Sequence, residues 1–214
     1  MTGCLNELVR LRVGSPFRER IQHDARGKFL VVQGKDIGSD GALILDGMVR
    51  VAEAPNKKAP DTLSQGDVIF QTRGVSYRAA IVPNVSTPMI AAGSLFIISP
   101  DAARIAPEYL VFFLNLPATQ AALRQMATGS TIPNLRRSAI EQLEVPLPNL
   151  PDQHWLVELA SLVRKESEIS KRINSLRLQE LHALTVERAK KAGGVKPPDS
   201  NRPERLGKRP QALS

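Results

Sequence analysis

Histidine and cysteine are the side chains that most often bind metals or carry catalysis, and this sequence has few of them. The three histidines are His23, His154 and His182, and no two of them have the spacing of paired metal ligands. The one cysteine, Cys4, adds no ligand cluster and has no partner for an internal disulfide. The sequence therefore predicts no metal site.

Two further patterns have the right residue types for chemistry but not the right arrangement. The glycine-rich segment 34–41 matches neither a P-loop nor the dinucleotide-binding fingerprint. The aspartates between residues 36 and 67 could be drawn as acid–base pairs, but each lies in a predicted turn, where Asp is common for backbone reasons. We therefore predict no catalytic residue, no cofactor bound by the chain itself and no enzymatic activity.

The basic residues are distributed unevenly along the chain. The net charge is +8 over 214 residues. Residues 1–154 carry 16 Lys and Arg against 14 Asp and Glu, or +2; residues 155–192 carry 8 against 5, and residues 193–214 carry 5 against 2, or +3 each. The last stretch is rich in Pro, Lys and Arg and has little to bury, so we expect a disordered tail, either simply solvated or in auxiliary contact with phosphates.

Length and hydropathy indicate the broad class of protein. The chain can form one medium domain with an appendage, since two full domains would be cramped. It has no apolar run of about 20 residues that could span a membrane, and no signal-like block at its N-terminus. We expect a soluble, cytoplasmic protein.

Short apolar runs alternate with turn residues in the first half of the chain. Runs of this length predict strands, and the glycines and prolines between them supply turns. The runs are 29–32, 43–45, 48–51, 67–70, 79–82 and 94–98. They predict a curved, antiparallel-rich sheet.

After Pro100 the apolar residues recur at helical spacing. Pro107 and Pro117 suit the first turns of two small helices, which we expect to end near Asn115 and Ala127. Their apolar residues fall on one face at helical spacing, as expected for helices that cover a core.

A Pro-rich segment then leads into a long helix. Pro146, Pro148 and Pro151 lack amide donors and fix φ, so this segment can form at most an edge strand, and a helix can begin only near Pro151. No Pro or Gly interrupts the sequence from there to about Ala192, which predicts a helix about 60 Å long. We expect a rigid elbow between a compact domain and a projecting helix.

Five motifs, in this order, resemble the target-recognition domain of type I restriction–modification specificity subunits. They are QGKDIG at 33–38, LSQGDVIFQTRG at 63–74, APEYL at 106–110, GSTIPNL at 129–135 and LEVPLPNLPDQ at 143–153. Each motif alone is weak, but their order, ending before a long helix, makes the resemblance specific over roughly residues 25–190. The pair Asp152 and Gln153 departs mildly from the more usual Glu-Gln, and the basic tail is not part of the family pattern.

The resemblance implies a noncatalytic reader of double-stranded DNA. Such a subunit docks modification (methyltransferase) subunits and directs adenine methylation, and it directs cleavage when a motor-nuclease restriction subunit joins. S-adenosylmethionine would then be bound by the methyltransferase. The chain itself contains no Asn-Pro-Pro-Tyr-type adenine-methylation motif.

Side-chain chemistry indicates which residues would contact DNA. In the segment 71–78, arginine can read guanine with two hydrogen bonds, while hydroxyls reach phosphates or bases; the alternative is an ordinary solvated hairpin. A second segment, 128–137, combines hydroxyls, an amide and two arginines with the start of a short helix, although Asn134 could act merely as a cap. The candidates are Arg73, Ser76, Tyr77, Arg78, Ser130, Thr131, Asn134, Arg136 and Arg137, with Lys35, Lys57 and Lys58 as weaker ones.

The predicted long helix carries an apolar stripe at three- and four-residue spacing. Glu166 interrupts the stripe, and beyond Leu176 it shifts as a four-residue stutter would shift it. Packing on the domain could cover the end near Trp155, whereas the remainder predicts a partner helix. The stripe, which we call the seam, consists of Trp155, Leu159, Leu162, Ile169, Ile173, Leu176, Leu181 and Leu184.

The predicted organisation is therefore α+β: a recognition domain over 1–150, a coiled-coil helix over 151–192 and a tail over 193–214. Family members usually carry two recognition domains and two helices, so this chain resembles a half-subunit. We expect a homodimer in which antiparallel helices set the spacing between two inverted half-sites. A stand-alone DNA-binding or regulatory protein, and an enzyme with an unrecognised site, are the alternatives.

Overall fold

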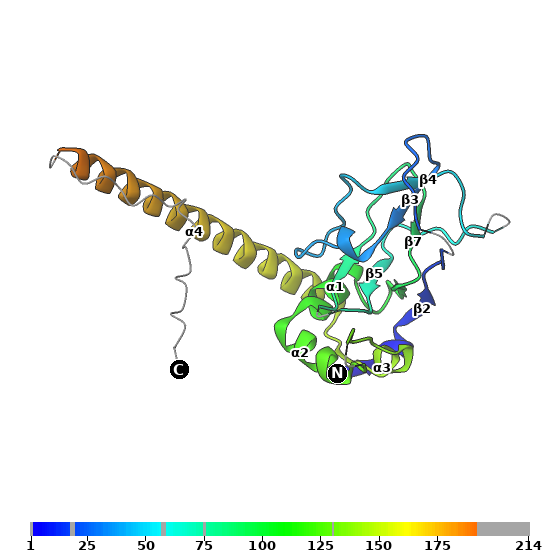
Figure 1. Ribbon diagram of the computed structural model, residues 1–214. Coiled ribbons are helices and arrows are strands. Elements are labelled where there is room, and N and C mark those ends of the chain that lie inside the picture. Colours follow the sequence, from blue (N-terminus) through cyan, green and yellow to red (C-terminus); the bar gives the residue numbers. More distant parts are fainter. Residues whose placement is uncertain (1, 18–19, 57–58, 75, 130, 192–214) are drawn as a thin grey trace, which may run out of the picture. The chain divides into compact units, whose positions relative to one another are not determined.

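The structure is a computed structural model that describes residues 2–17, 20–56, 59–74, 76–129 and 131–191. Backbone contacts divide the chain into two compact units, residues 1–163 (the N-terminal unit) and residues 164–214, of which 164–191 (the distal helix) are described. Among the described residues, all strands and short helices belong to the N-terminal unit (Figure 1). The predicted tail, Lys57 and Lys58 lie outside the described residues.

The largest sheet is antiparallel and lies at the centre of the core. Its strands, in order across the sheet, are β2 (Val9–Val13), β8 (Leu95–Pro100), β5 (Val68–Gln71) and β6 (Ala79–Ile81). Successive side chains of a strand point to opposite faces, so Val68 and Phe70 enter one hydrophobic cluster and Ile69 enters another. Both faces of β5 are therefore covered, which explains its continuous apolar run.

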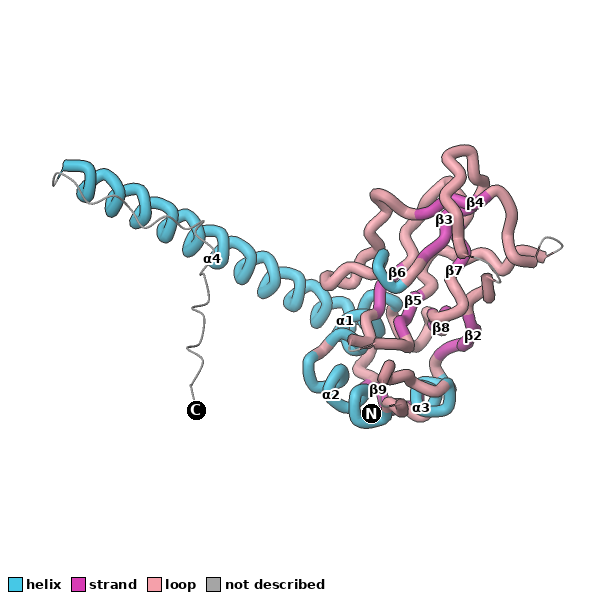
Figure 2. Tube along the Cα trace, in the orientation of Figure 1, coloured by secondary structure: helices cyan, strands magenta, loops and turns pink. Residues whose placement is uncertain are grey.

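Two smaller sheets complete the strand arrangement. One contains β4 (Val49–Val51), β3 (Phe29–Val32) and β7 (Met89–Ala91), with β3 antiparallel to β4 and parallel to β7. The other pairs β1 (Thr2–Cys4) with β9 (Glu144–Pro146), so the start of the chain lies beside the Pro-rich segment. Figure 2 shows that loops connect these short strands over much of the unit.

Short helices cover one side of the larger sheet. They are α1 (Pro107–Asn115), α2 (Pro117–Met126) and α3 (Arg137–Glu141), with single 3-10 turns η1 (Leu5–Glu7) and η2 (Gly34–Asp36) elsewhere. Proline occupies the first position of both α1 and α2, where its missing amide costs no hydrogen bond. Leu110, Leu114 and Leu123 are fully buried against the cluster that contains Phe70.

The long helix α4 (Leu150–Lys191) begins inside the N-terminal unit. Gln153 is fully buried there: its Oε1 accepts a hydrogen bond from the Ala106 amide at 2.8 Å, and its Nε2 donates to the carbonyls of Arg104 at 3.0 Å and Pro148 at 2.9 Å. Leu156 packs against the core in the next turn. One glutamine thus ties the first turn of α4 to the segment before α1 and to the Pro-rich segment.

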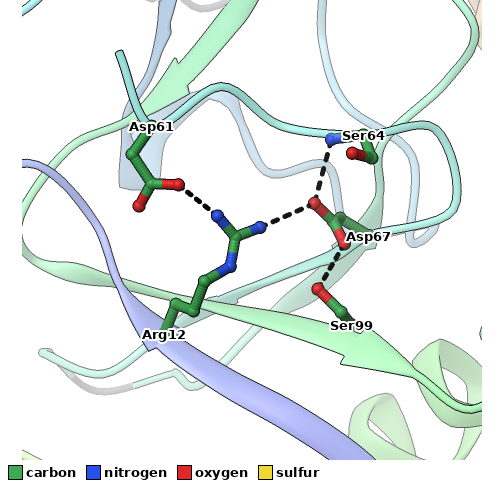
Figure 3. A network of polar contacts seen from close by, with 5 residues as sticks. All are labelled: Arg12, Asp61, Ser64, Asp67 and Ser99. Atoms are coloured by element: carbon green, nitrogen blue, oxygen red, sulfur yellow. Dashed lines mark hydrogen bonds and ion pairs between the residues drawn. The ribbon is translucent and has the colours of Figure 1, made fainter. Parts of the chain in front are cut away.

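A polar network ties β2 and β8 to the segment that leads into β5. The Arg12 guanidinium lies between the carboxylates of Asp61 and Asp67, at 3.1 Å from Asp67 (Figure 3). Asp67 is buried and also accepts hydrogen bonds from the Ser64 amide at 2.9 Å and the Ser99 hydroxyl at 2.6 Å. A buried carboxylate is stable when it is paired and hydrogen-bonded in this way.

The α+β class and the antiparallel-rich pattern predicted from the sequence are confirmed. The strands divide into three small sheets, and one pair is parallel. The run 43–45 contributes only an isolated bridge between Ile37 and Leu43, whereas β1, β2 and β7 had no predicted counterpart. β9 lies at the start of the Pro-rich segment, which was expected to form at most an edge strand. Both small helices begin at their predicted prolines, and α4 begins one residue before Pro151.

Candidate nucleic-acid interface

Two segments that the sequence predicted separately, 71–78 and 128–137, lie side by side. The Leu135 amide donates to the Thr72 carbonyl at 2.8 Å, and the Gly74 amide donates to the Pro133 carbonyl at 3.0 Å. Backbone bonds on both sides of Arg73 therefore hold the first segment against the second. The pairing is long-range and extends past the end of strand β5.

The loop between Thr128 and Asn134 is closed by its own backbone. The two residues exchange amide-to-carbonyl hydrogen bonds at 3.0 and 2.9 Å, and Asn134 also forms a bridge with Arg73. Gly129 allows this turn with a φ of +106°, in the left-handed region that favours glycine, where an added Cβ would lie 3.1 Å from the Ile132 carbonyl oxygen. Asn134 does not cap α3, since the cap position is Arg136.

The 3-10 turn η2, which contains Lys35, lies beside the start of the segment 71–78. A Cβ built on Gly34 would lie 3.4 Å from the Gln71 side chain, and Gln71 Nε2 donates to the Arg73 carbonyl at 2.8 Å. The turn is closed by buried Asp36, whose carboxylate accepts the Gln33 amide at 2.8 Å. Burial raises the pKa of the Asp36 carboxyl, and the Gln33 amide and the charge of Lys35 oppose that rise.

Two side-chain amides hold the outer edge of β6 and the residues before it. Gln120 accepts from the Tyr77 amide at 3.1 Å and donates to the Tyr77 carbonyl at 2.7 Å, and it also donates to the Leu114 carbonyl at 2.7 Å. Asn115 accepts from the Ala79 amide at 3.0 Å and donates to the Ala79 carbonyl at 2.8 Å. These amide clamps satisfy backbone groups that an edge strand would otherwise leave open.

The clamps determine where the side chains of 76–78 point. Tyr77 is fully buried in the core, and its hydroxyl has no hydrogen-bond partner among the described residues. The prediction that Tyr77 contacts DNA is therefore wrong, because its side chain is buried in the same hydrophobic cluster as Phe70 and Ala79. Ser76 is half-buried, and Arg78 is exposed with Nη1 at 3.5 Å from the Ile37 carbonyl.

Some of the basic side chains in these three segments have an acidic partner and others do not, among the described residues. Lys35, Arg73 and Arg136 are exposed. The charge of Lys35 acts on the neighbouring Asp36 carboxyl, whereas the described residues give Arg73 and Arg136 no acidic partner. Arg137 instead donates to the Glu141 carboxylate at 2.7 Å within α3. Thr131 is exposed on the closed loop, and Ser130 lies outside the described residues. Two cations without an acidic partner among the described residues, beside hydroxyl and amide groups, suit an anionic, hydrogen-bonding ligand.

We call the surface formed by residues 33–37, 71–74, 76–78, 128–129 and 131–137 the basic face. It contains the DNA-contact candidates that the structure describes, with Tyr77 removed. Among the described residues, no group of three or more His, Cys, Asp or Glu side chains could hold a metal ion. No described helix is both long and apolar enough to cross a membrane. The residues that sequence reasoning missed are the clamps Asn115 and Gln120, which carry no motif of their own.

The seam is exposed along α4. At the Trp155 end of the helix, Leu156 and Val157 pack against the core, so the domain covers this end in part, while Trp155 itself stays 59% exposed. The seam residues Leu159, Leu162, Ile169, Ile173, Leu176, Leu181 and Leu184 are all exposed. Val163 and Leu178 are further exposed apolar side chains that the predicted seam omitted.

A protein-family model described as "Type I restriction modification DNA specificity domain" matches residues 4–176 of this chain. The match covers nearly all of the N-terminal unit and continues into the distal helix. A comparison with curated proteins gave no match.

Solved structures share the fold at low sequence identity. The type I restriction-modification system S subunit from M. genitalium has a TM-score of 0.54 at 18% identity, covering 78% of this chain and 40% of that chain. The HsdS subunit from Thermoanaerobacter tengcongensis has a TM-score of 0.60 at 16% identity, covering 80% and 39%. A structure described as "Structural basis underlying complex assembly and conformational transition of the type I R-M system" has a TM-score of 0.61 at 19% identity. The match covers 86% of this chain and 43% of that chain. This chain thus spans about two fifths of each.

Proposed function

Because the chain belongs to the type I restriction modification DNA specificity domain family, we propose that it reads the target DNA sequence for a restriction–modification complex. The observation that carries this proposal is the basic face. Segments around Arg73 and Asn134 meet there through backbone hydrogen bonds, and the turn that contains Lys35 lies beside the Gln71 side chain. Arg73 and Arg136 are exposed there without an acidic partner among the described residues. Cations of this kind hold phosphates, and an arginine can also read guanine.

The chain itself would be noncatalytic. Its partners would be double-stranded DNA in the cytoplasm, a modification (methyltransferase) subunit that binds S-adenosylmethionine, and, for cleavage, a motor-nuclease subunit. Adenine methylation is then directed by this chain and carried out by the methyltransferase. The absence of an adenine-methylation motif from the sequence supports this division of labour.

We further propose that the seam binds the same helix of a second copy of this chain. Its residues are apolar and exposed over both parts of α4, from Trp155 to Leu184. Apolar residues at three- and four-residue spacing are buried when two helices pair. Two copies would present two basic faces, so an inverted pair of half-sites is the expected target.

The test is selection of duplexes from a random-sequence library by the purified full chain, with a methyltransferase copurified from the native host. We expect one sequence to be enriched and to become adenine-methylated only when both proteins are present. Enrichment without any copurified methyltransferase would support a stand-alone DNA-binding protein instead. Methylation by this chain alone, or no enrichment at all, would contradict the proposal.

A matched control separates specific reading from general charge. Arg188 lies on the distal helix and is exposed. Arg188→Ala removes one positive charge, as Arg73→Ala does, but leaves the basic face intact. The enriched sequence should therefore be unchanged with Arg188→Ala and altered or lost with Arg73→Ala.

A further inference from the structure

Ile132 is the most exposed large apolar side chain among the described residues of the N-terminal unit. Its exposed fraction is 63%, against 59% for Trp155 on α4 and, outside α4, 50% for Ile44. It lies in the closed loop of the basic face, between Thr131 and Pro133. Folding of the described chain therefore leaves a large apolar side chain uncovered in the middle of a polar, cationic surface.

The backbone around Ile132 is held on both sides. The Pro133 carbonyl accepts the Gly74 amide at 3.0 Å, and Thr128 and Asn134 close the loop with two hydrogen bonds. The proline that follows restricts Ile132 to extended conformations, and its branched Cβ restricts χ1. The backbone and χ1 of Ile132 thus have few alternatives, so less conformational entropy is lost when this side chain is covered.

The charges beside the loop indicate what covers it. Arg73 is bridged to Asn134, and Arg136 follows two residues after Asn134; both are exposed and lack acidic partners among the described residues. Charge complementarity therefore favours a polyanion over an apolar protein surface. Within a DNA duplex, the apolar surface available to a branched side chain is mainly the faces of stacked bases, which proteins reach by opening a base step.

We propose that Ile132 is an apolar wedge that inserts between adjacent base pairs of the target duplex and kinks it. This inference rests on the proposed function and assigns a role to a side chain that makes no polar contact. Arg136 holds the flanking phosphate backbone, Arg73 lies within reach of a neighbouring base edge, and the closed loop presents the branched side chain to the base step. Specificity then includes the ease with which the step unstacks.

The experiment uses the full chain and the duplex recovered by the selection above, with a donor and an acceptor dye at its two ends. Binding of the wild-type chain should raise energy transfer, because a kink shortens the end-to-end distance. Ile132→Ala should abolish this rise and weaken binding to the selected duplex about tenfold, with little change for a scrambled duplex. Ile132→Leu should keep both. Ile44→Ala is the control and should behave as wild type.

Three results would overturn the wedge while leaving the proposed function intact. The first is an unchanged rise in energy transfer with Ile132→Ala. The second is sequence discrimination by the wild-type chain with no rise at all. The third is a loss of affinity on replacing thymine by deoxyuridine that occurs with wild type and not with Ile132→Ala, since Ile132 would then contact a thymine methyl group in the groove. A wild-type chain that does not discriminate between duplexes overturns the wedge and the proposed function together.

Discussion

The N-terminal unit and the distal helix differ in how far their apolar side chains are buried and in how their polar groups are paired. In the N-terminal unit, apolar residues fill two clusters, and even buried polar groups such as Asp67 and Gln153 have partners. In the distal helix, every described side chain is exposed except Val186, which is half-buried. Polar contacts there are local, as between Lys191 and Glu187 at 2.6 Å.

The difference separates two kinds of interaction surface. The basic face is fixed by folding of the chain itself, so substitutions there should change binding at any protein concentration. The seam is completed only by another helix, so substitutions there should show effects that depend on concentration. A helix of this composition gains most of its stability from packing rather than from its own backbone.

The largest expected effect tests whether the distal helix depends on a partner. Ile169→Asp with Ile173→Asp places charge in the seam of both copies, where each isoleucine would contribute roughly 1.5–3 kcal/mol when buried. We expect monomers in sedimentation velocity at tens of micromolar, with the N-terminal unit still folded. Ser170→Asp with Ser175→Asp adds the same charge outside the seam and should leave the dimer intact. A wild-type chain that remains monomeric would show that the seam is not completed by a second copy of this helix.

The second effect concerns the N-terminal unit at its junction with α4. Gln153→Leu keeps the volume but leaves the Ala106 amide and two carbonyls without their partner, which should cost about 3–5 kcal/mol. Urea unfolding of the full chain measures this loss at any concentration. Gln125→Leu is the control, since Gln125 is exposed on α2. Equal stability of the two variants would mean that Gln153 does not anchor the helix.

A third prediction sharpens the role of the basic face in reading bases. Arg73→Ala or Arg78→Ala should reduce discrimination between the selected and a scrambled duplex by roughly 1–3 kcal/mol for each two-point base contact that is lost. Arg73, for which the described part of the chain offers no acidic partner, should matter more than Arg78, which already contacts the Ile37 carbonyl. Equilibrium binding to both duplexes decides between them. Wild-type discrimination in both variants would place base reading elsewhere.

A fourth prediction tests the correction at Tyr77. Tyr77→Phe removes a buried hydroxyl without a partner and should stabilise the chain by about 1 kcal/mol. Tyr109→Phe removes a hydroxyl that donates to the Pro146 carbonyl at 2.8 Å, so it should destabilise the chain by a similar amount. Thermal or urea unfolding of the two variants measures whether each substitution raises or lowers the free energy of unfolding. A loss of DNA binding with Tyr77→Phe would restore Tyr77 as a contact.

The buried Tyr77 phenol predicts that the stability of the chain depends on pH in the alkaline range. Burial raises the pKa of the Tyr77 phenol above its ordinary value of 10.0, against a smaller lowering effect of Arg124. The folded state then holds the proton more tightly than the unfolded state, so the free energy of unfolding falls as pH rises above about 10. This fall should be less steep in Tyr77→Phe than in the wild type.

The smallest effect separates phosphate contacts from base contacts. Arg136→Ala should weaken binding to all duplexes by less than about tenfold and reduce the slope of log K against log salt by about 1. Arg137→Ala should do less, because Arg137 is paired with Glu141 in the free protein. Titrations at several salt concentrations test both. A sequence-dependent loss with Arg136→Ala would instead make it a base-reading residue.

Local patterns were sufficient to predict most elements of the fold. The prolines at 107, 117 and 151 mark the starts of α1, α2 and α4 to within one residue, because proline acts through its own backbone. β7 was not predicted, since Met89–Ala91 is short and its parallel partner β3 lies far away in the sequence. The segment 43–45 looks like a strand locally but finds no extended partner.

The candidate site was predictable in its parts but not in its assembly. Residue types indicated Arg73, Asn134 and Lys35 separately, but their proximity depends on long-range hydrogen bonds that no spacing encodes. Tyr77 was misassigned because a loop was expected where the clamp by Gln120 holds an extended segment that turns the ring inward. Whether the remaining candidates contact DNA stays a prediction.

The frame of the basic face is made of main-chain atoms, and this has a consequence for changing what the protein reads. The hydrogen bonds that position Arg73 involve the amides and carbonyls of its neighbours, and the clamps Asn115 and Gln120 grip backbone at Tyr77 and Ala79 rather than any exposed side chain. The outward side chains can therefore be exchanged without moving the scaffold that carries them. New target sequences should be obtainable by varying positions 73, 76, 78, 131 and 136 together in a library, with the clamps and Gly129 kept constant.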